Sequence, residues 1–265
     1  MLTSNKIALL DTDFISKSLQ ITDGNESLLD VVLSLPGYHF FCHQCILDEL
    51  KKYSVSAYEY VKRCIDGCLI TRFSDADIIK MLAEERENRV AVNIYMSFLQ
   101  SACSFLGSDL FSRYDINGDE SSIDDFVEAL HASDRKVERG AGLGEVKTFV
   151  LLQTIAFKTA AEQLYVFCSD DRDARKGAVN FHNAKCVNIL SAFLWLRRER
   201  DWDGISAEPY IQSYVEFCRR YSQQTFYVLS SGSINVYLRV PCKQVLKEIF
   251  EDRFFLLNDG FLQYK

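Results

Sequence analysis

Six acidic residues lie beside elements that we expect to end at one edge of a parallel sheet. One follows the apolar run at 7–10, three follow the run at 164–169, one lies in the opening turns of a helix after the run at 38–43, and one lies at a glycine-marked helix start. These acids are Asp11, Glu49, Glu145, Asp170, Asp171 and Asp173. Carboxylates gathered in one place repel one another, so one must take a proton or a cation must compensate. An all-oxygen site of this kind suits Mg²⁺ or Mn²⁺.

Phosphodiester hydrolysis is the reaction that such a site suits best. A divalent ion activates water and neutralises phosphate charge, and a pair of ions would also stabilise the leaving oxygen. Basic residues next to the acids are then candidates to contact the phosphate backbone. These candidates are Arg172, Arg175, Lys176 and Lys147.

The elements that must position these residues have the pattern of an α/β protein. The runs at 7–10, 38–43, 164–169 and 185–189 are short and apolar throughout, which is typical of strands buried on both faces. Helical periodicity separates them, most clearly over 145–163. Ligands of such sheets collect beyond the carboxyl ends of the strands, where the six acids are expected.

Two regions are expected outside this alternation. Residues 75–140 have helical spacing and serine caps, so we predict a helical insertion. From about 205 the sequence pattern changes. Apolar and polar residues alternate over 224–240 around Gly232 and Ser233, which indicates a hairpin, and residues 242–254 have the pattern of a helix. We therefore divide the chain into a core domain over 1–204 and a small C-terminal α+β extension over 205–265.

Four segments resemble the motifs of PIN-domain ribonucleases. IALLDTDFIS is similar to their opening strand, and FFCHQCILDELKKY is similar to their second strand and helix. GLGEVKTFVLLQTIAF resembles the Gly-Glu helix start of one subgroup, and VFCSDDRDAR resembles its Asp-Asp-Arg-x-Ala-Arg motif. The resemblance covers about 1–70 and 140–205, and the helical insertion and the tail after 222 depart from it.

The resemblance implies a three-layer α/β/α fold around a central, mostly parallel sheet. It implies a metal-dependent endoribonuclease in which Asp11, Glu49, Glu145 and Asp171 hold Mg²⁺ or Mn²⁺, with Asp170 and Asp173 as helpers. Ser169 matches the small hydroxyl residue two positions before the fourth acid. The products would carry a 5′-phosphate and a 3′-hydroxyl. Because many PIN toxins are held silent by an antitoxin, the resemblance also implies a protein partner or a homo-oligomer, docked through 75–140 or the extension.

Two other functions remain open. Asp11-Thr12-Asp13 also resembles the nucleophile motif of haloacid-dehalogenase-like phosphatases, in which Asp11 would form an aspartyl-phosphate. Against this, Phe14 and Ile15 stand where that family favours small residues. The chain could also be a catalytically weak interaction module on a PIN-like scaffold.

Three further patterns favour structural interpretations. The stretch 115–126 lacks the glycine and glutamate of a calcium loop, since Glu120 and Phe126 stand at those positions. Cys42, Cys45, Cys64 and Cys68 with His39 and His43 could supply zinc ligands, but buried reduced thiols are the better interpretation. The glycines at 140, 142 and 144 do not have the spacing of a dinucleotide fingerprint.

The charge and hydropathy narrow the class of protein. The chain of 265 residues carries a net charge of −7, which argues against a general nucleic-acid coat. Residues 105–134, however, contain eight of the 37 acids and one of the 30 bases, so the rest is neutral. We expect this acidic segment to dock a basic partner or to mimic RNA. The absence of a signal or transmembrane pattern and the nine cysteines predict a cytoplasmic protein.

Overall fold

The computed structural model describes residues 6–107, 109–116, 122–137, 142–159, 164–179, 184–232 and 236–265. Its central sheet has five parallel strands in the order β3-β2-β1-β4-β5. The strands are β1 (Lys6–Leu10), β2 (Tyr38–His43), β3 (Ile70–Phe73), β4 (Leu164–Cys168) and β5 (Ala184–Val187). The predicted α/β class and parallel sheet are confirmed.

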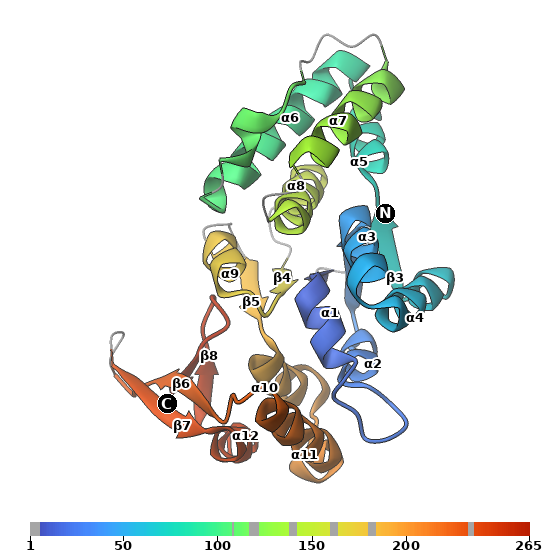
Figure 1. Cartoon of the computed structure of the whole chain (residues 1–265). Coiled ribbons are helices and arrows are strands. Elements are labelled where there is room, and N and C mark those ends of the chain that lie inside the picture. The colour runs from blue at the N-terminus through green and yellow to red at the C-terminus, as the bar shows by residue number, and fades with distance from the viewer. Residues whose placement is uncertain are drawn as a thin grey trace.

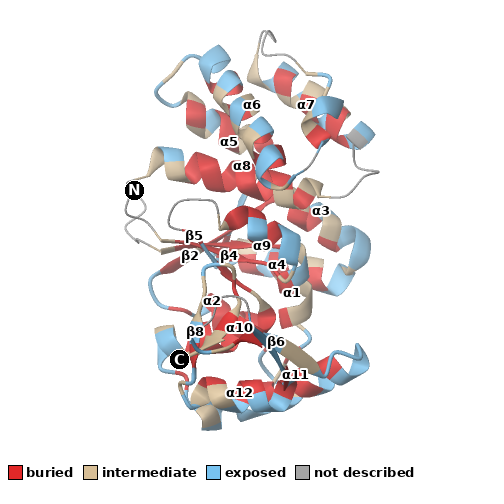
Figure 2. Cartoon of the chain, turned by 90° about the vertical axis from the view of Figure 1, so that its left-hand side faces the viewer, coloured by how far each residue is buried: buried red, intermediate tan, exposed pale blue. Residues whose placement is uncertain are grey.

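Residues of β1 alternate between two cores, as a strand covered on both faces must. Ala8 and Leu10 pack into one core, and Ile7 and Leu9 pack into the other. The first core is covered by α1 (Thr12–Ser18), α2 (Leu28–Leu33), α3 (Gln44–Tyr53), α4 (Val55–Asp66) and α10 (Ile189–Arg200). Figure 2 shows the buried strands between two helical layers, which is the predicted three-layer α/β/α arrangement.

The second core is covered mainly by the predicted helical insertion. The insertion supplies α5 (Asp75–Ala83), α6 (Asn88–Phe105), the short 3-10 helix η1 (Leu110–Arg113) and α7 (Ile123–Val137). Two helices beyond the insertion complete this layer, α8 (Leu143–Lys158) and α9 (Arg172–Ala178). Figure 1 shows α5 to α8 together on one side of the sheet. Residues 180–183, between α9 and β5, lie outside the described part of the chain.

Strand β3 was not predicted, and its composition explains why. Its central residues Thr71 and Arg72 are exposed, because β3 is the edge strand beside β2. Without a continuous apolar run, the segment ITRF has no local strand signal. The strand matters for function because it carries the chain to Asp75 at the carboxyl edge of the sheet.

The C-terminal extension contains a second sheet in the order β7-β6-β9-β8. The predicted hairpin is confirmed by the antiparallel pairing of β6 (Thr225–Leu229) with β7 (Tyr237–Pro241), although residues 233–235 of its turn lie outside the described residues. The predicted helix is α12 (Cys242–Phe250), whereas α11 (Gly204–Arg220), β8 (Phe254–Leu256) and β9 (Leu262–Tyr264) were not predicted.

The extension does not have a core of its own. Val228 and Val240 of the second sheet belong to the same hydrophobic core as Leu10 of the central sheet. Two arginines near the end of α10 bind this region: Arg197 pairs with Asp252, and Arg198 donates to the Phe254 carbonyl. Arg200 instead donates to Ser34, which follows α2. No described helix combines the length and apolar character needed to cross a bilayer.

Candidate functional site

Asp11 lies at the centre of the carboxyl edge of the sheet, directly after β1. Its side chain is buried, with 4% of the residue exposed. Its Oδ2 accepts a hydrogen bond from the Ser169 hydroxyl at 2.8 Å, and the same hydroxyl accepts the backbone N–H of Asp171 at 3.1 Å. Ser169 therefore connects the ends of β1 and β4, which are neighbouring strands.

Burial makes the ionised form of Asp11 unfavourable. Loss of solvent, followed by repulsion from Glu145, raises the pKa of Asp11 from 3.8 to about 8. The hydrogen bond from Ser169 opposes this rise but does not offset it. At neutral pH the carboxyl therefore carries a proton unless a cation replaces it.

Glu49 and Glu145 approach the same edge from α3 and α8. The Thr12 hydroxyl donates a hydrogen bond to Glu49 Oε2 at 2.5 Å, which ties α1 to α3. A Cβ added to Gly144 would lie 3.2 Å from Glu49 Oε2, so α8 passes very close to this carboxylate. Burial, and then the charges of Glu49 and Asp171, raise the pKa of Glu145. The four acids predicted as metal ligands are thus electrostatically coupled.

Asp171 is exposed and caps α9, where its Oδ1 accepts the backbone N–H of Ala174 at 2.7 Å. The four acids come from β1, α3, α8 and the loop after β4, as the sequence predicted. They are spread along the edge: among the described residues, no three of them place carboxylate oxygens within 4.8 Å of one another. A cation bound by all four would therefore keep some of its water ligands, as Mg²⁺ usually does.

The two predicted helper acids have other partners. Asp170 pairs with Lys17 at 2.7 Å and accepts the backbone N–H of Ile189 at 3.3 Å, at the start of α10. Asp173 is exposed and pairs with Lys176 at 2.7 Å. That ion pair lowers the pKa of Asp173, whereas the pKa values of Asp11 and Glu145 are raised.

Two of the predicted phosphate contacts need correction. Lys147 is fully buried, with its Nζ 3.1 Å from carboxylate oxygens of both Asp75 and Asp134. It is two residues from Glu145, and residues two apart on a helix do not share a face. Arg175 is also buried, and it donates to the backbone carbonyls of Ser169, Asp171 and Asp259. It holds the loop after β4 in place and does not face a substrate.

Arg172 and Lys176 are exposed, so both remain available to a substrate. The guanidinium of Arg172 lies over the Phe261 ring, 5.6 Å from its centroid. Lys176 is engaged by Asp173 in an exposed pair, which is weak because water competes for both groups. Arg172 is therefore the better placed of the two predicted cations.

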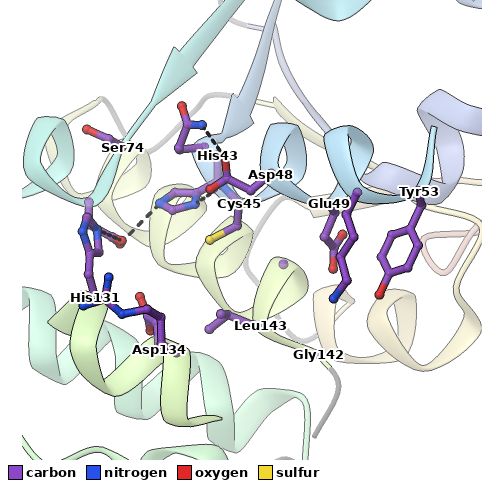
Figure 3. A pocket seen from close by; sticks show the side chains of 15 residues that line it. His43, Cys45, Asp48, Glu49, Tyr53, Ser74, His131, Asp134, Gly142 and Leu143 are labelled. Atoms are coloured by element: carbon purple, nitrogen blue, oxygen red, sulfur yellow. Dashed lines mark hydrogen bonds and ion pairs between the residues drawn. The ribbon is translucent and has the colours of Figure 1, made fainter. Parts of the chain in front are cut away.

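A pocket of about 630 Å³ adjoins the acids on the β2–β3 side of the sheet. Glu49 and Tyr53 of α3 lie at one end, and His131 and Asp134 of α7 lie at the other (Figure 3). The wall of the pocket nearest the four acids consists of Gly142, Gly144 and the exposed side of α3. This pocket could not be predicted from the sequence, because it depends on how the insertion packs against α3.

A second polar cluster forms the far end of this pocket. Asp75, His131 and Asp134 place one ligand atom each within 4.8 Å of one another, which is a spacing that a metal ion could use. The ammonium of Lys147 stands between Asp75 and Asp134, however, and it already supplies a positive charge to both. Burial alone would raise the pKa of Asp75, but Lys147 and then His43 hold it well below its usual value.

His43 and two tyrosines complete this cluster. The Nδ1 of His43 accepts the backbone N–H of Cys45 at 3.1 Å, so a neutral ring carries its proton on Nε2, 3.3 Å from Asp75 Oδ1. The hydroxyls of Tyr95 and Tyr114 donate to Asp75 and Asp134. The cluster is thus an internal ion-pair network that fixes the insertion to the sheet. The sequence signal was weak, since its members are far apart in the chain.

The remaining sequence hypotheses are settled in part. All nine cysteines are free and seven are buried, as expected of reduced thiols. No cysteine belongs to a metal-ligand group among the described residues. Residues 117–121 of the rejected calcium loop, and Gly140, lie outside the described residues. Within the acidic segment 105–134, Asp134 is committed to Lys147, and Asp119 and Glu120 lie outside the described residues.

Comparison with known proteins adds no relative. No protein-family model, curated protein or solved structure matches the chain.

Proposed function

We propose that this protein is a metal-dependent endoribonuclease of the PIN type, acting at the carboxyl edge of the central sheet. One observation carries the proposal: a buried aspartate at the end of the central strand is surrounded by acids from three other elements. Such an arrangement is costly to a folded protein, and acids of this kind cluster at functional sites. The four motifs that resemble PIN ribonucleases contain these same acids.

The donor set fits a hard divalent cation. Asp11, Glu49, Glu145 and Asp171 offer oxygen atoms only, and burial together with repulsion between the acids raises the pKa of Asp11 and Glu145, so a bound cation would offset the repulsion. These four residues would hold Mg²⁺ or Mn²⁺. When bound, such an ion supplies an activated water and neutralises charge on a phosphodiester.

The surrounding residues position the acids. Ser169 holds one oxygen of Asp11, and Thr12 holds one oxygen of Glu49, so each carboxylate keeps a second oxygen for the cation. Gly144 allows α8 to approach Glu49 closely. Arg172, exposed beside Asp171, is available to bind a phosphate of the RNA.

The direct test is cleavage of RNA by the purified full-length chain. We expect discrete fragments with Mn²⁺ that vanish with EDTA, and fragments with 5′-phosphate ends. The Asp11→Asn variant should lose cleavage while it keeps the wild-type circular dichroism spectrum. Glu59→Gln, on the exposed side of α4, is the matched carboxylate-to-amide control and should cleave normally.

Three outcomes would contradict the proposal. A folded Asp11→Asn protein that still cleaves RNA would remove Asp11 from the mechanism. Release of phosphate from a small phosphoester, with RNA left intact, would favour the phosphatase alternative. A wild-type protein that neither binds Mn²⁺ in calorimetry nor cleaves RNA would leave only the interaction module.

A further inference from the structure

The second sheet presents an open face that the nuclease proposal does not use. Tyr227 of β6 and Arg239 of β7 are directly opposite each other, and both are exposed. Tyr237 lies two residues from Arg239 on the same face, and its ring meets that of Phe261 edge-on with centroids 6.0 Å apart. The exposed fraction of Tyr227 is 60%. Aromatic rings and a guanidinium are thus interleaved on one surface.

This face forms one wall of a groove that leads to the acids. The groove has a volume of about 470 Å³, and its opposite wall contains Asp170 and Arg172, which flank the predicted metal ligand Asp171. Phe261 joins the two walls, because the guanidinium of Arg172 lies over its ring. Figure 1 shows the C-terminal strands below α9 and beside α10.

The topology places the groove and the larger pocket on opposite sides of Asp11. The strand order is β3-β2-β1-β4-β5, with Asp11 at the end of the central strand. The larger pocket is lined from the ends of β2 and β3 by His43 and Asp75. The groove is lined from the ends of β4 and β5 by Asp170 and Asn188. A strand crossing the acids would therefore continue into the groove.

The charge of the groove favours an anionic ligand. Three arginines and one aspartate line it, and that aspartate pairs with Lys17 at 2.7 Å. Arg175 is buried, so Arg172 and Arg239 supply the accessible positive charge. Arg239 Nε donates to the Thr225 hydroxyl at 2.7 Å, which orients the guanidinium across the strand pair.

We infer that the exposed face of the second sheet binds single-stranded RNA and guides it to the acids. This inference rests on the proposed function, because it assigns the substrate path of the same site. Tyr227, Tyr237 and Phe261 would stack on unpaired bases, and Arg172 and Arg239 would bind phosphates. A duplex hides its base faces, so the surface selects single strands.

The test is binding of a fluorescein-labelled 12-nucleotide oligouridylate to the full chain in EDTA, followed by anisotropy. Stacking of a base on an aromatic ring contributes to the binding free energy, so we expect Tyr227→Ala to raise the Kd about tenfold. Tyr227→Phe keeps the ring and should leave the Kd within about twofold of the wild type. Arg239→Gln should raise the Kd and should reduce the slope of log Kd against log salt by about 0.7, the contribution of one phosphate contact on a single strand.

Matched controls come from exposed residues outside the groove. Tyr221 is 62% exposed, almost the same as Tyr227, and Arg219 is an exposed arginine of α11. We expect Tyr221→Ala and Arg219→Gln to bind like the wild type. All variants are at exposed positions, and unchanged thermal unfolding would show that each is folded.

The outcomes separate this inference from the nuclease proposal. If the wild type cleaves RNA with Mn²⁺ but Tyr227→Ala and Arg239→Gln bind as tightly as it does, the guiding surface is wrong and the nuclease stands. If RNA binds through Tyr227 and Arg239 but Mn²⁺ gives no cleavage, the inferred RNA-binding surface is supported and the nuclease proposal is wrong. Equal affinity for a 12-base-pair RNA duplex, or no measurable binding, would overturn the surface.

Discussion

Replacing Asp11 by asparagine removes a buried carboxyl whose ionised form is unfavourable in the folded protein. In the folded chain burial and the charge of Glu145 raise the pKa of this carboxyl from 3.8 to about 8. In the unfolded chain the carboxyl has its ordinary pKa. Between pH 4 and 8 the folded protein therefore binds up to one more proton than the unfolded chain, and its stability falls as the pH rises.

The expected size follows from this difference. One pKa unit corresponds to about 1.4 kcal/mol, so between pH 5 and 7 this one carboxyl lowers the free energy of unfolding by about 3 kcal/mol. An asparagine does not titrate, so Asp11→Asn should lack this decline. Any change in hydrogen bonding to Ser169 adds an offset that does not depend on pH, so the slope against pH is the informative quantity.

Urea unfolding in metal-free buffer, repeated at each pH from 5 to 8, measures the slope. The difference in free energy of unfolding between Asp11→Asn and wild type should grow by about 3 kcal/mol from pH 5 to 7 and should level off above pH 8. The exposed Glu59→Gln control should follow the wild-type slope. Parallel curves for Asp11→Asn and wild type would refute the argument that burial and repulsion act on Asp11.

Three other predictions address the metal and the insertion. The affinity for Mn²⁺ should rise about tenfold per pH unit up to about pH 8, because the cation must displace the proton of Asp11; a flat profile in calorimetry between pH 6 and 8 would contradict this. Lys147→Met leaves two buried aspartates without their shared cation and should lower the free energy of unfolding by about 3–5 kcal/mol, whereas the exposed Lys185→Met should change it little. Gly144→Ala introduces a Cβ 3.2 Å from the Glu49 carboxylate, so it should weaken Mn²⁺ binding several-fold while urea unfolding shows a change within about 1 kcal/mol. Wild-type Mn²⁺ affinity in this last variant would show that Glu49 is not a ligand.

The strands of the site could be predicted because each is buried on both faces. Residues of β1 contact both cores, so the whole strand is apolar and its end is marked by Asp11. The acid after β4 is found in the same way. Strand β3 fails this test, since its outer face is exposed and Thr71 and Arg72 interrupt the pattern. Local sequence therefore indicates the apolar strands, including the edge strand β5, and misses the more polar edge strand β3.

The direction of the side chains on α8 also could not be predicted from the sequence. Glu145 and Lys147 are two residues apart, and proximity in sequence suggested a shared role. In the structure Glu145 is coupled to the acids, whereas Lys147 is buried against Asp75. The rotation of α8 about its axis decides between these positions, and that rotation is fixed by the packing of α8 against α6 and the sheet.

The sequence by itself determined the α/β class, the central strands and the acids at their ends, because an apolar run and the acid that follows it are features of a short stretch of chain. Tertiary structure alone decided which residues meet. It placed Asp75, Asp134 and Lys147 together from three helices, and it set the face of β6 and β7 beside Arg172. Contacts between distant segments depend on strand order and helix rotation, and neither is a property of any short stretch of chain.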